Sequence, residues 1–413
     1  MIIESIKKQN TDNGVRLTAQ ITSDRQSFEI WYEASSEIGY YFCDERADAF
    51  VVALMPYAMS IGEDIISNVP ISAQLKHSLV KSQIPYMVKL SQKYHNISII
   101  SEINSDKLES ANHVGTSISC GVDSLSTLVW EGLLADESRY KIDSLTLFNA
   151  GHYGNNQEIS EKKFSVHFQN ATDFCNEHGY QLIRVDSNVG SVLPNEFVSS
   201  VSFLILSVVL SLQKYFSVYY FASTYCLFQS EPIFEDSESY DFITTQNVGT
   251  ENIRIISACG EKTRIEKVKL LTEHPSIFKH VFPCVNGNPP HNCGYCEKCR
   301  YTIMALDLLG RMDLAETIFD LSYYKKNRTS LYAFMLLHQS RRIDIVNAPI
   351  YRELRQYMKE NRIRLPFGTV LFLPYQYYRA TMRLPIRHFI RRLLQSVLGE
   401  KAVGKLKHKR EDA

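Results

Sequence analysis

The residues best suited to chemistry form a short polar turn at positions 119–124, with the sequence Ser-Cys-Gly-Val-Asp-Ser. An apolar run at 114–118 precedes the turn, and apolar residues at helical spacing follow it over 125–134. The order of strand, glycine-containing turn and helix is typical of phosphate sites, because backbone N–H groups at a helix start point toward the anion. The turn therefore predicts that a phosphate group binds there.

Each polar residue of this turn can contribute to such a site. Gly121 lets a phosphate approach the backbone, and the Ser119 and Ser124 hydroxyls can donate to its oxygens. A carboxylate beside a phosphate needs a bridging cation, so we expect Asp123 to hold Mg²⁺. The alternative interpretation is an ordinary helix N-cap formed by Ser119 or Asp123.

Four of the nine cysteines lie close together in the sequence, in the pattern Cys284-x₈-Cys293-x₂-Cys296-x₂-Cys299. Four thiolates at short spacing suit a tetrahedral structural Zn²⁺ ion, provided that the protein is in a reducing compartment. An iron–sulfur cluster is the second interpretation, because four cysteines serve either metal centre. Buried thiols without a metal are the third.

The turn Ser119-Cys120-Gly121-Val122-Asp123-Ser124 resembles the PP-loop of the ATP pyrophosphatase (adenine nucleotide alpha hydrolase-like) superfamily, usually written Ser-Gly-Gly-X-Asp-Ser. Cys120 replaces the first glycine of that pattern, and a cysteine is strained there if the position needs a positive φ. A PP-loop followed by four cysteines resembles the 7-cyano-7-deazaguanine synthase family over roughly residues 112–305. The chain has additional residues on both sides of that region, about 110 in front and about 100 behind.

The resemblance implies a reaction class. ATP would bind with its β,γ-pyrophosphate on the loop, and a carboxylate or amide-like oxygen of a small molecule would attack the α-phosphorus. Pyrophosphate would leave, and a nitrogen or sulfur nucleophile would then displace AMP, as in a ligase. The triphosphate needs positive charge around it, and the best local candidates are Lys262, Arg264 and Lys267. Gly151 and His152 follow the second predicted strand, where the superfamily shapes its adenine pocket.

Three alternatives to this interpretation remain. Lys262, Arg264 and Lys267 equally fit the solvated face of a helix. A tRNA-modifying PP-loop sulfurtransferase would share the loop. A nucleotide-binding regulatory protein without turnover would also fit, since Cys120 departs from the family pattern.

Charge is unevenly distributed although the formal net charge of the 413 residues is +0. Residues 351–413 carry 15 Lys and Arg against 5 Asp and Glu, and an amphipathic pattern runs over 384–398. This basic tail suits contact with tRNA or an anionic membrane, or docking on the acidic remainder of the chain. No signal peptide is recognisable, and the most apolar run, 201–212, is too short to span a membrane, so we expect a cytoplasmic protein. The oligomeric state stays open, with a homodimer as one option.

Strand-like and helix-like runs alternate over residues 111–275, which predicts an α/β fold with a doubly wound parallel sheet. The candidate strands are 114–118, 144–148, 181–185 and 218–222. Ligands of such sheets bind beyond the carboxyl ends of the strands. We predict a small α+β domain at 1–110, an ATP-binding domain at 111–275, a cysteine knuckle with a helix at 276–330, and a basic helical extension at 331–413.

Overall fold

The computed structural model describes residues 1–151, 157–193, 197–229, 231–284 and 291–382. The chain forms two compact units, Met1–Asp320 and Leu321–Ala413. His152 and the amphipathic pattern at 384–398 lie outside the described residues, so both predictions remain as stated. Among the described helices, none is both long and apolar enough to cross a bilayer.

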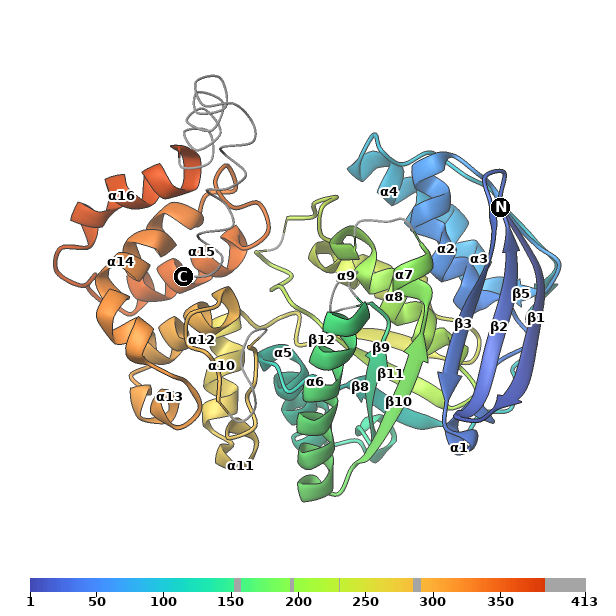
Figure 1. Ribbon diagram of the computed structural model, residues 1–413, viewed down its shortest axis with the longest axis horizontal. Coiled ribbons are helices and arrows are strands. Elements are labelled where there is room, and N and C mark those ends of the chain that lie inside the picture. Colours follow the sequence, from blue (N-terminus) through green and yellow to red (C-terminus); the bar gives the residue numbers. More distant parts are fainter. Residues whose placement is uncertain (152–156, 194–196, 230, 285–290, 383–413) are drawn as a thin grey trace, which may run out of the picture. The chain divides into compact units, whose positions relative to one another are not determined.

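A ten-stranded sheet forms the centre of the first unit, in the order β12-β11-β8-β9-β10-β3-β2-β1-β4-β6 (Figure 1). The bounds are β1 Ile2–Thr11, β2 Gly14–Thr22, β3 Ser27–Ala34, β4 Ile65–Ser67, β6 Ile99–Ile100, β8 His113–Ser117, β9 Ser144–Asn149, β10 Gln181–Ser187, β11 Phe216–Ala222 and β12 Arg254–Ala258. A separate pair is formed by β5 (Ile71–Ser72) and β7 (Ile103–Asn104). The predicted α/β class is confirmed.

Strands β8 to β12 are mutually parallel, and their order places β8 at the point where the chain changes direction across the sheet. From β8 the chain proceeds to β9 and β10 on one side, and later to β11 and β12 on the other. Such a switch point leaves a crevice beyond the carboxyl ends of the strands, where ligands bind in open α/β sheets. The turn at 119–124 directly follows β8, so it lies at this switch point.

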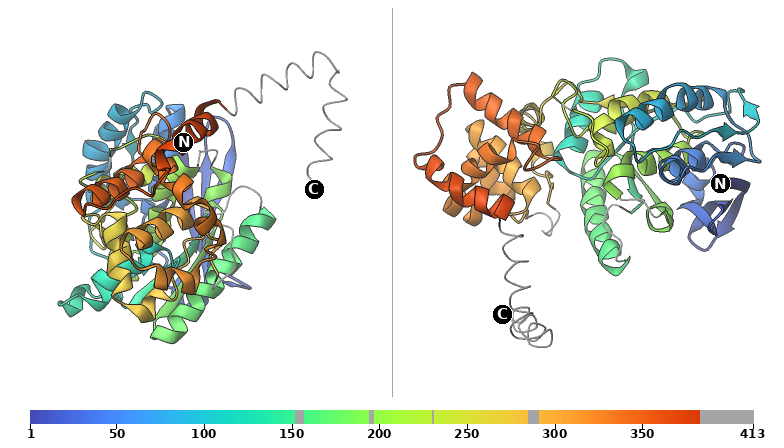
Figure 2. Two further views of the ribbon diagram at one scale, coloured as in Figure 1. Left: turned by 90° about the vertical axis from the view of Figure 1, so that its left-hand side faces the viewer. Right: turned by 90° about the horizontal axis from the view of Figure 1, so that it is seen from above.

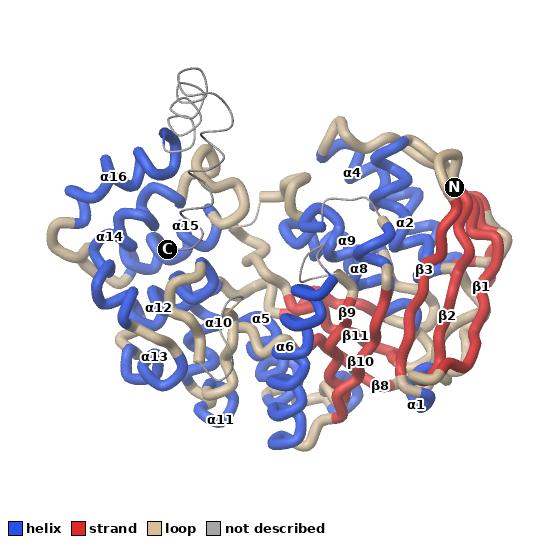
Figure 3. The backbone as a smooth tube through the Cα atoms, in the orientation of Figure 1, coloured by secondary structure: helices blue, strands red, loops and turns tan. Residues whose placement is uncertain are grey.

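The N-terminal region shares this sheet and does not form a sheet of its own. Strands β1, β2 and β3 form an antiparallel meander, and β3 pairs with β10 through Glu33–Asp186 and Tyr32–Ser187. The boundary between the two compact units lies after Asp320, not near residue 110. The α+β region predicted at 1–110 therefore extends the parallel sheet (Figure 3).

Helices cover both faces of the sheet (Figures 1 and 3). The α-helices of the first unit are α1 Ser36–Gly39, α2 Asp48–Ile61, α3 Ala73–Ser78, α4 Ile84–Leu90, α5 Val122–Thr127, α6 Gln157–His178, α7 Val189–Val192, α8 Phe197–Ser211, α9 Asp241–Asn247, α10 Arg264–Thr272, α11 Pro275–Phe278, α12 Glu297–Leu308 and α13 Met312–Ile318. One large core gathers the apolar residues of α2 and α8 against the sheet. The run at 201–212 is thus a buried helix, as predicted.

The second unit is helical, as the sequence predicts for the C-terminal extension. Its α-helices, orange to red in Figure 2, are α14 Ser322–His338, α15 Ala348–Glu360 and α16 Leu373–Tyr377. Single turns of 3₁₀ and π helix at 369–372 and 378–382 flank α16.

Candidate functional site

The backbone of the turn at 119–124 has one unusual residue, Cys120. Cys120 adopts φ +56°, a left-handed conformation that favours glycine. Its side chain is fully buried, with Sγ 4.0 Å from the carbonyl oxygen of Asn170 on α6. Burial holds the pKa of the Cys120 thiol well above its usual range, so this sulfur stays protonated and unreactive.

The strain at Cys120 can be measured with two substitutions. We expect Cys120→Gly to be more stable than Cys120→Ala by about 1 kcal/mol, because only the alanine retains a Cβ at positive φ. Both variants lose the same buried sulfur, so its packing cancels in the comparison. Urea unfolding measures the difference. Cys43, buried without a positive φ, is the control at which alanine should exceed glycine. An alanine advantage at both positions would rule out the strain.

The serine hydroxyls of the turn hold its shape. Ser119 Oγ accepts from the Gly121 N–H at 3.4 Å and lies 3.3 Å from Ser124 Oγ. Ser124 Oγ also donates to the Gly121 carbonyl at 3.2 Å. Val122 is buried as the first residue of α5, which continues as a turn of π helix over 128–133. The turn is thus a compact polar structure that leads directly into a helix.

Asp123 binds two buried cations that come from α10. Arg264 Nη1 lies 2.8 Å from Asp123 Oδ2, and Lys267 Nζ lies 3.2 Å from Asp123 Oδ1. The Lys267 side chain is fully buried and also donates to the carbonyl of Ser223, which follows β11. The structure thus brings together three of the predicted residues at the carboxyl edge of the sheet.

The start of helix α10 determines which of the three basic residues lie near the turn. Thr263 caps its N-terminus in a capping box with Glu266, so the helix begins at Arg264. Arg264 and Lys267 are three residues apart and share a face of the helix. Lys262 precedes the cap, and its ammonium group pairs with Glu261 at 3.1 Å and lies 3.5 Å from the centre of the Trp130 ring. The structure does not bring Lys262 to Asp123.

Gly151 follows β9 at the same edge of the sheet, with φ +99°. A Cβ on this residue would lie 2.8 Å from the Cα of Gly190, so a side chain has no space there. The two glycines let the segments after β9 and β10 approach closely. Gly151 therefore shapes the edge of the site.

Acidic residues between β11 and β12, which no pattern in the sequence indicates, lie close to this site, with Glu238 near Asp123. Tyr225 donates to Asp236 Oδ2 at 2.6 Å, and Asp236 Oδ1 accepts from the backbone N–H of Glu238. Burial and then the nearby charge of Asp236 raise the pKa of Glu238 to about 7. Lys298 on α12 lowers this pKa, which places its charge near Glu238. A carboxyl group that titrates near neutral pH can exchange protons with a substrate.

Asp241 is a further buried carboxylate of this region. Its Oδ1 accepts from Ser257 at 2.9 Å and from Ser223 at 3.3 Å. Its Oδ2 is buried without a hydrogen-bond partner among the described residues. Lys267 is the nearby charge that offsets part of the cost of this burial. Asp241 thus adds a second carboxylate near Lys267.

We expect Asp241 to make the free energy of unfolding decrease as the pH rises from about 4 to about 6. Burial raises its pKa from 3.8 to about 6, so in this window the folded state binds a proton that the unfolded state lacks. At most about 3 kcal/mol is involved, given 1.36 kcal/mol per pKa unit. Urea unfolding of Asp241→Asn at several pH values should lack this component. The control Asp24→Asn, at an exposed position, should retain this pH dependence. If the free energy of unfolding of Asp241→Asn varies with pH as in the wild-type protein, Asp241 is not its source.

The four clustered cysteines converge in space. Their sulfur atoms all lie within 4.8 Å of one another, close enough to bind one metal ion. Cys296 is the N-cap of α12, so the positive end of this helix favours thiolates. Hydrogen bonds from Cys284 and Cys296, together with burial, hold the pKa of Cys299 well above its usual range. A divalent cation bound by the four sulfur atoms would offset the repulsion between neighbouring thiolates.

The cysteine cluster and the turn at 119–124 are physically connected. The N–H of Phe282, two residues before Cys284, donates to the carbonyl of Cys120 at 2.7 Å. On α12, the buried ring of Tyr301 lies 5.3 Å from the Arg264 guanidinium. The two strongest sequence signals therefore belong to one structural unit.

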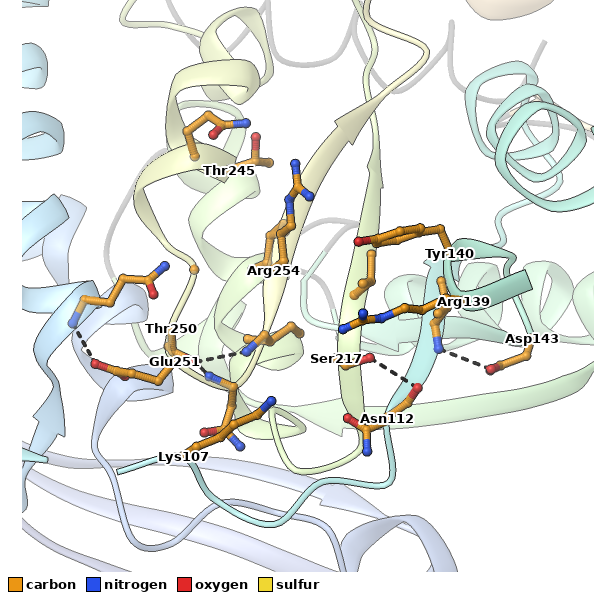
Figure 4. Close-up of a pocket in the computed structure, with 18 of the residues that line it drawn as sticks. Lys107, Asn112, Arg139, Tyr140, Asp143, Ser217, Thr245, Thr250, Glu251 and Arg254 are labelled. Atoms are coloured by element: carbon orange, nitrogen blue, oxygen red, sulfur yellow. Dashed lines mark hydrogen bonds between the residues drawn. The ribbon is translucent and has the colours of Figure 1, made fainter. Parts of the chain in front are cut away.

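A separate hollow of about 680 Å³ lies at the opposite, amino edge of the parallel strands (Figure 4). Arg139 and Arg254 line it together with Lys107. Its acidic residues already have partners, since Asp143 pairs with His113 and Glu251 pairs with Arg46. This hollow does not include the turn at 119–124.

No family model, curated protein or solved structure matches the chain.

Proposed function

We propose that the protein is an ATP-dependent enzyme that forms AMP and pyrophosphate, of the PP-loop class. The observation that carries the proposal is the position of Asp123, Arg264 and Lys267 at the switch point of the parallel sheet. Two buried cations beside a turn between strand and helix supply the charge that a triphosphate requires.

In this proposal the β,γ-phosphates of ATP bind at residues 119–124, and Lys267 and Arg264 neutralise the charge that develops on pyrophosphate. A carboxylate or amide-like oxygen of the substrate attacks the α-phosphorus as the bond to pyrophosphate breaks, which gives an adenylate. A nitrogen or sulfur nucleophile then displaces AMP and loses a proton. Glu238 is suited to accept that proton, because its pKa is about 7.

The role of Asp123 in this proposal differs from a simple Mg²⁺ ligand. Both of its oxygens already contact cations, one from Arg264 and one from Lys267. A Mg²⁺ ion would have to share this carboxylate with two positive charges, so the fit is poor. We assign Asp123 to position the two cations.

We propose that the four cysteines hold a structural Zn²⁺ ion. All four positions of a tetrahedral Zn²⁺ would be occupied by sulfur, which leaves none open for chemistry. The ion would instead fix α12 and the Phe282 segment against the turn. Purified protein should be colourless, whereas visible absorbance would indicate an iron–sulfur cluster and favour the sulfurtransferase alternative.

The proposal is tested by the products formed from ATP and Mg²⁺ in the presence of pooled small-molecule acids and amides. We expect AMP and pyrophosphate in equal amounts, separated by anion-exchange chromatography. Formation of ADP and phosphate would indicate a different reaction. Binding of ATP without turnover under any pool would favour the regulatory alternative, and absence of ATP binding would exclude the loop assignment.

A further inference from the structure

Three metal-binding side chains meet at the end of α6, away from both sites described above. Glu177 and His178 are the last two residues of α6, and His280 follows α11. The ligand atoms of the three residues lie within 4.8 Å of one another. Glu177 Oε2 lies 3.0 Å from His280 Nε2, and Glu177 Oε1 lies 4.0 Å from His178 Nε2. Two imidazoles and a carboxylate are a ligand set that Zn²⁺ accepts.

A second observation concerns the free ring nitrogen of His178. Its Nε2 is buried and has no hydrogen-bond partner among the described residues. Buried polar atoms without a partner are uncommon and call for a water or an ion. Phe174 packs against both imidazoles, with ring centres 4.5 Å from His178 and 5.1 Å from His280. The two rings are therefore held in place beside the same carboxylate.

The electrostatic surroundings also favour a cation. The C-terminus of α6, a helix of 22 residues, carries the negative end of the helix dipole. Lys279 Nζ pairs with Glu177 Oε1, but unlike the two buried cations at Asp123 its side chain is 53% exposed. It can turn into solvent when a metal takes its place.

We propose that Glu177, His178 and His280 bind a divalent transition-metal ion of the Zn²⁺ class. Zinc bonds of 2.0–2.1 Å place neighbouring ligands about 3.3 Å apart in a tetrahedron, so small side-chain shifts suffice. Water would take the fourth position. The ion would join α6 to the segment that leads to Phe282, whose N–H contacts Cys120. This inference does not depend on the proposed function.

Cobalt titration of the metal-free full-length protein tests the proposal. We expect two equivalents of Co²⁺ to bind. One should give the intense thiolate-to-cobalt charge-transfer band of the cysteine cluster, and the other only weak d–d bands. The double variant His178→Gln/His280→Gln should bind the thiolate equivalent alone. Retention of that band also shows that the variant is folded.

The control is His113→Gln, because His113 is also partly exposed and paired with a carboxylate, Asp143, at 3.1 Å. It should bind two equivalents. Glu177→Gln is a second test variant at a more exposed position, and its affinity for the second equivalent should fall by more than about tenfold. Absence from the wild-type protein of the equivalent with only weak d–d bands, or its persistence in the double variant, would overturn the proposal.

Discussion

The variant Lys267→Met is expected to release pyrophosphate from ATP at least about a hundredfold more slowly than the wild-type protein, the cost of removing one preorganised donor in other active sites. The Lys267 ammonium group is fully buried and contacts Asp123 and the Ser223 carbonyl, so it is already oriented before ATP binds. Methionine fills a similar volume without the charge. Steady-state release of pyrophosphate at saturating ATP measures the effect.

The matched control is Lys269→Met on the same helix, because Lys269 is exposed and points away from the turn. It should leave the rate unchanged. Far-UV circular dichroism and thermal unfolding should show that Lys267→Met is folded, since Arg264 still pairs with the partly exposed Asp123. If both variants retain full activity, Lys267 does not contact the transition state, and the site must lie elsewhere.

The sequence predicts the parallel strands well because they are buried apolar runs. The predicted strands 114–118, 144–148, 181–185 and 218–222 correspond to β8, β9, β10 and β11 with ends shifted by two residues at most. Strand β12 was missed, since its five residues include the polar Arg254 and Ser257. Such a short run of mixed apolar and polar residues has no clear hydrophobic period.

The joining of the N-terminal strands to the parallel sheet could not be predicted. Strand β3 pairs with β10 through only two residue pairs, Glu33–Asp186 and Tyr32–Ser187. Backbone hydrogen bonds of this kind leave no pattern in the side chains. The sequence therefore shows where the strands are, but not which strands are neighbours.

For the candidate site, sequence patterns within one helix predict its residues, whereas residues brought close only by tertiary folding leave no pattern. Thr263 and Glu266 form a capping-box pattern that can be read from the sequence, and it would have favoured Arg264 and Lys267 over Lys262. Glu238 and Asp241 carry no such signal. Glu238 lies near Asp123, and Asp241 near Lys267, through tertiary folding of the segment between β11 and β12.

The variant Cys299→Ser is expected to lose its bound metal at the cysteine cluster and several kcal/mol of stability, because structural zinc sites contribute directly to folding free energy. Cys299 is fully buried, with Sγ 3.3 Å from Cys296 Sγ and 4.0 Å from Cys293 Sγ. Elemental analysis after gel filtration measures the metal, and urea unfolding measures the stability.

The control Cys43→Ser changes an equally buried cysteine outside the cluster, so it should retain the metal and cost only the burial of a hydroxyl, about 1–3 kcal/mol. The same experiment tests how the two sequence signals are connected. Tyr301 on α12 packs against Arg264, and Phe282 holds Cys120, so loss of the metal should also weaken ATP binding. A Cys299→Ser variant that lacks the metal but binds ATP normally would show that the turn at 119–124 is stable without the cluster.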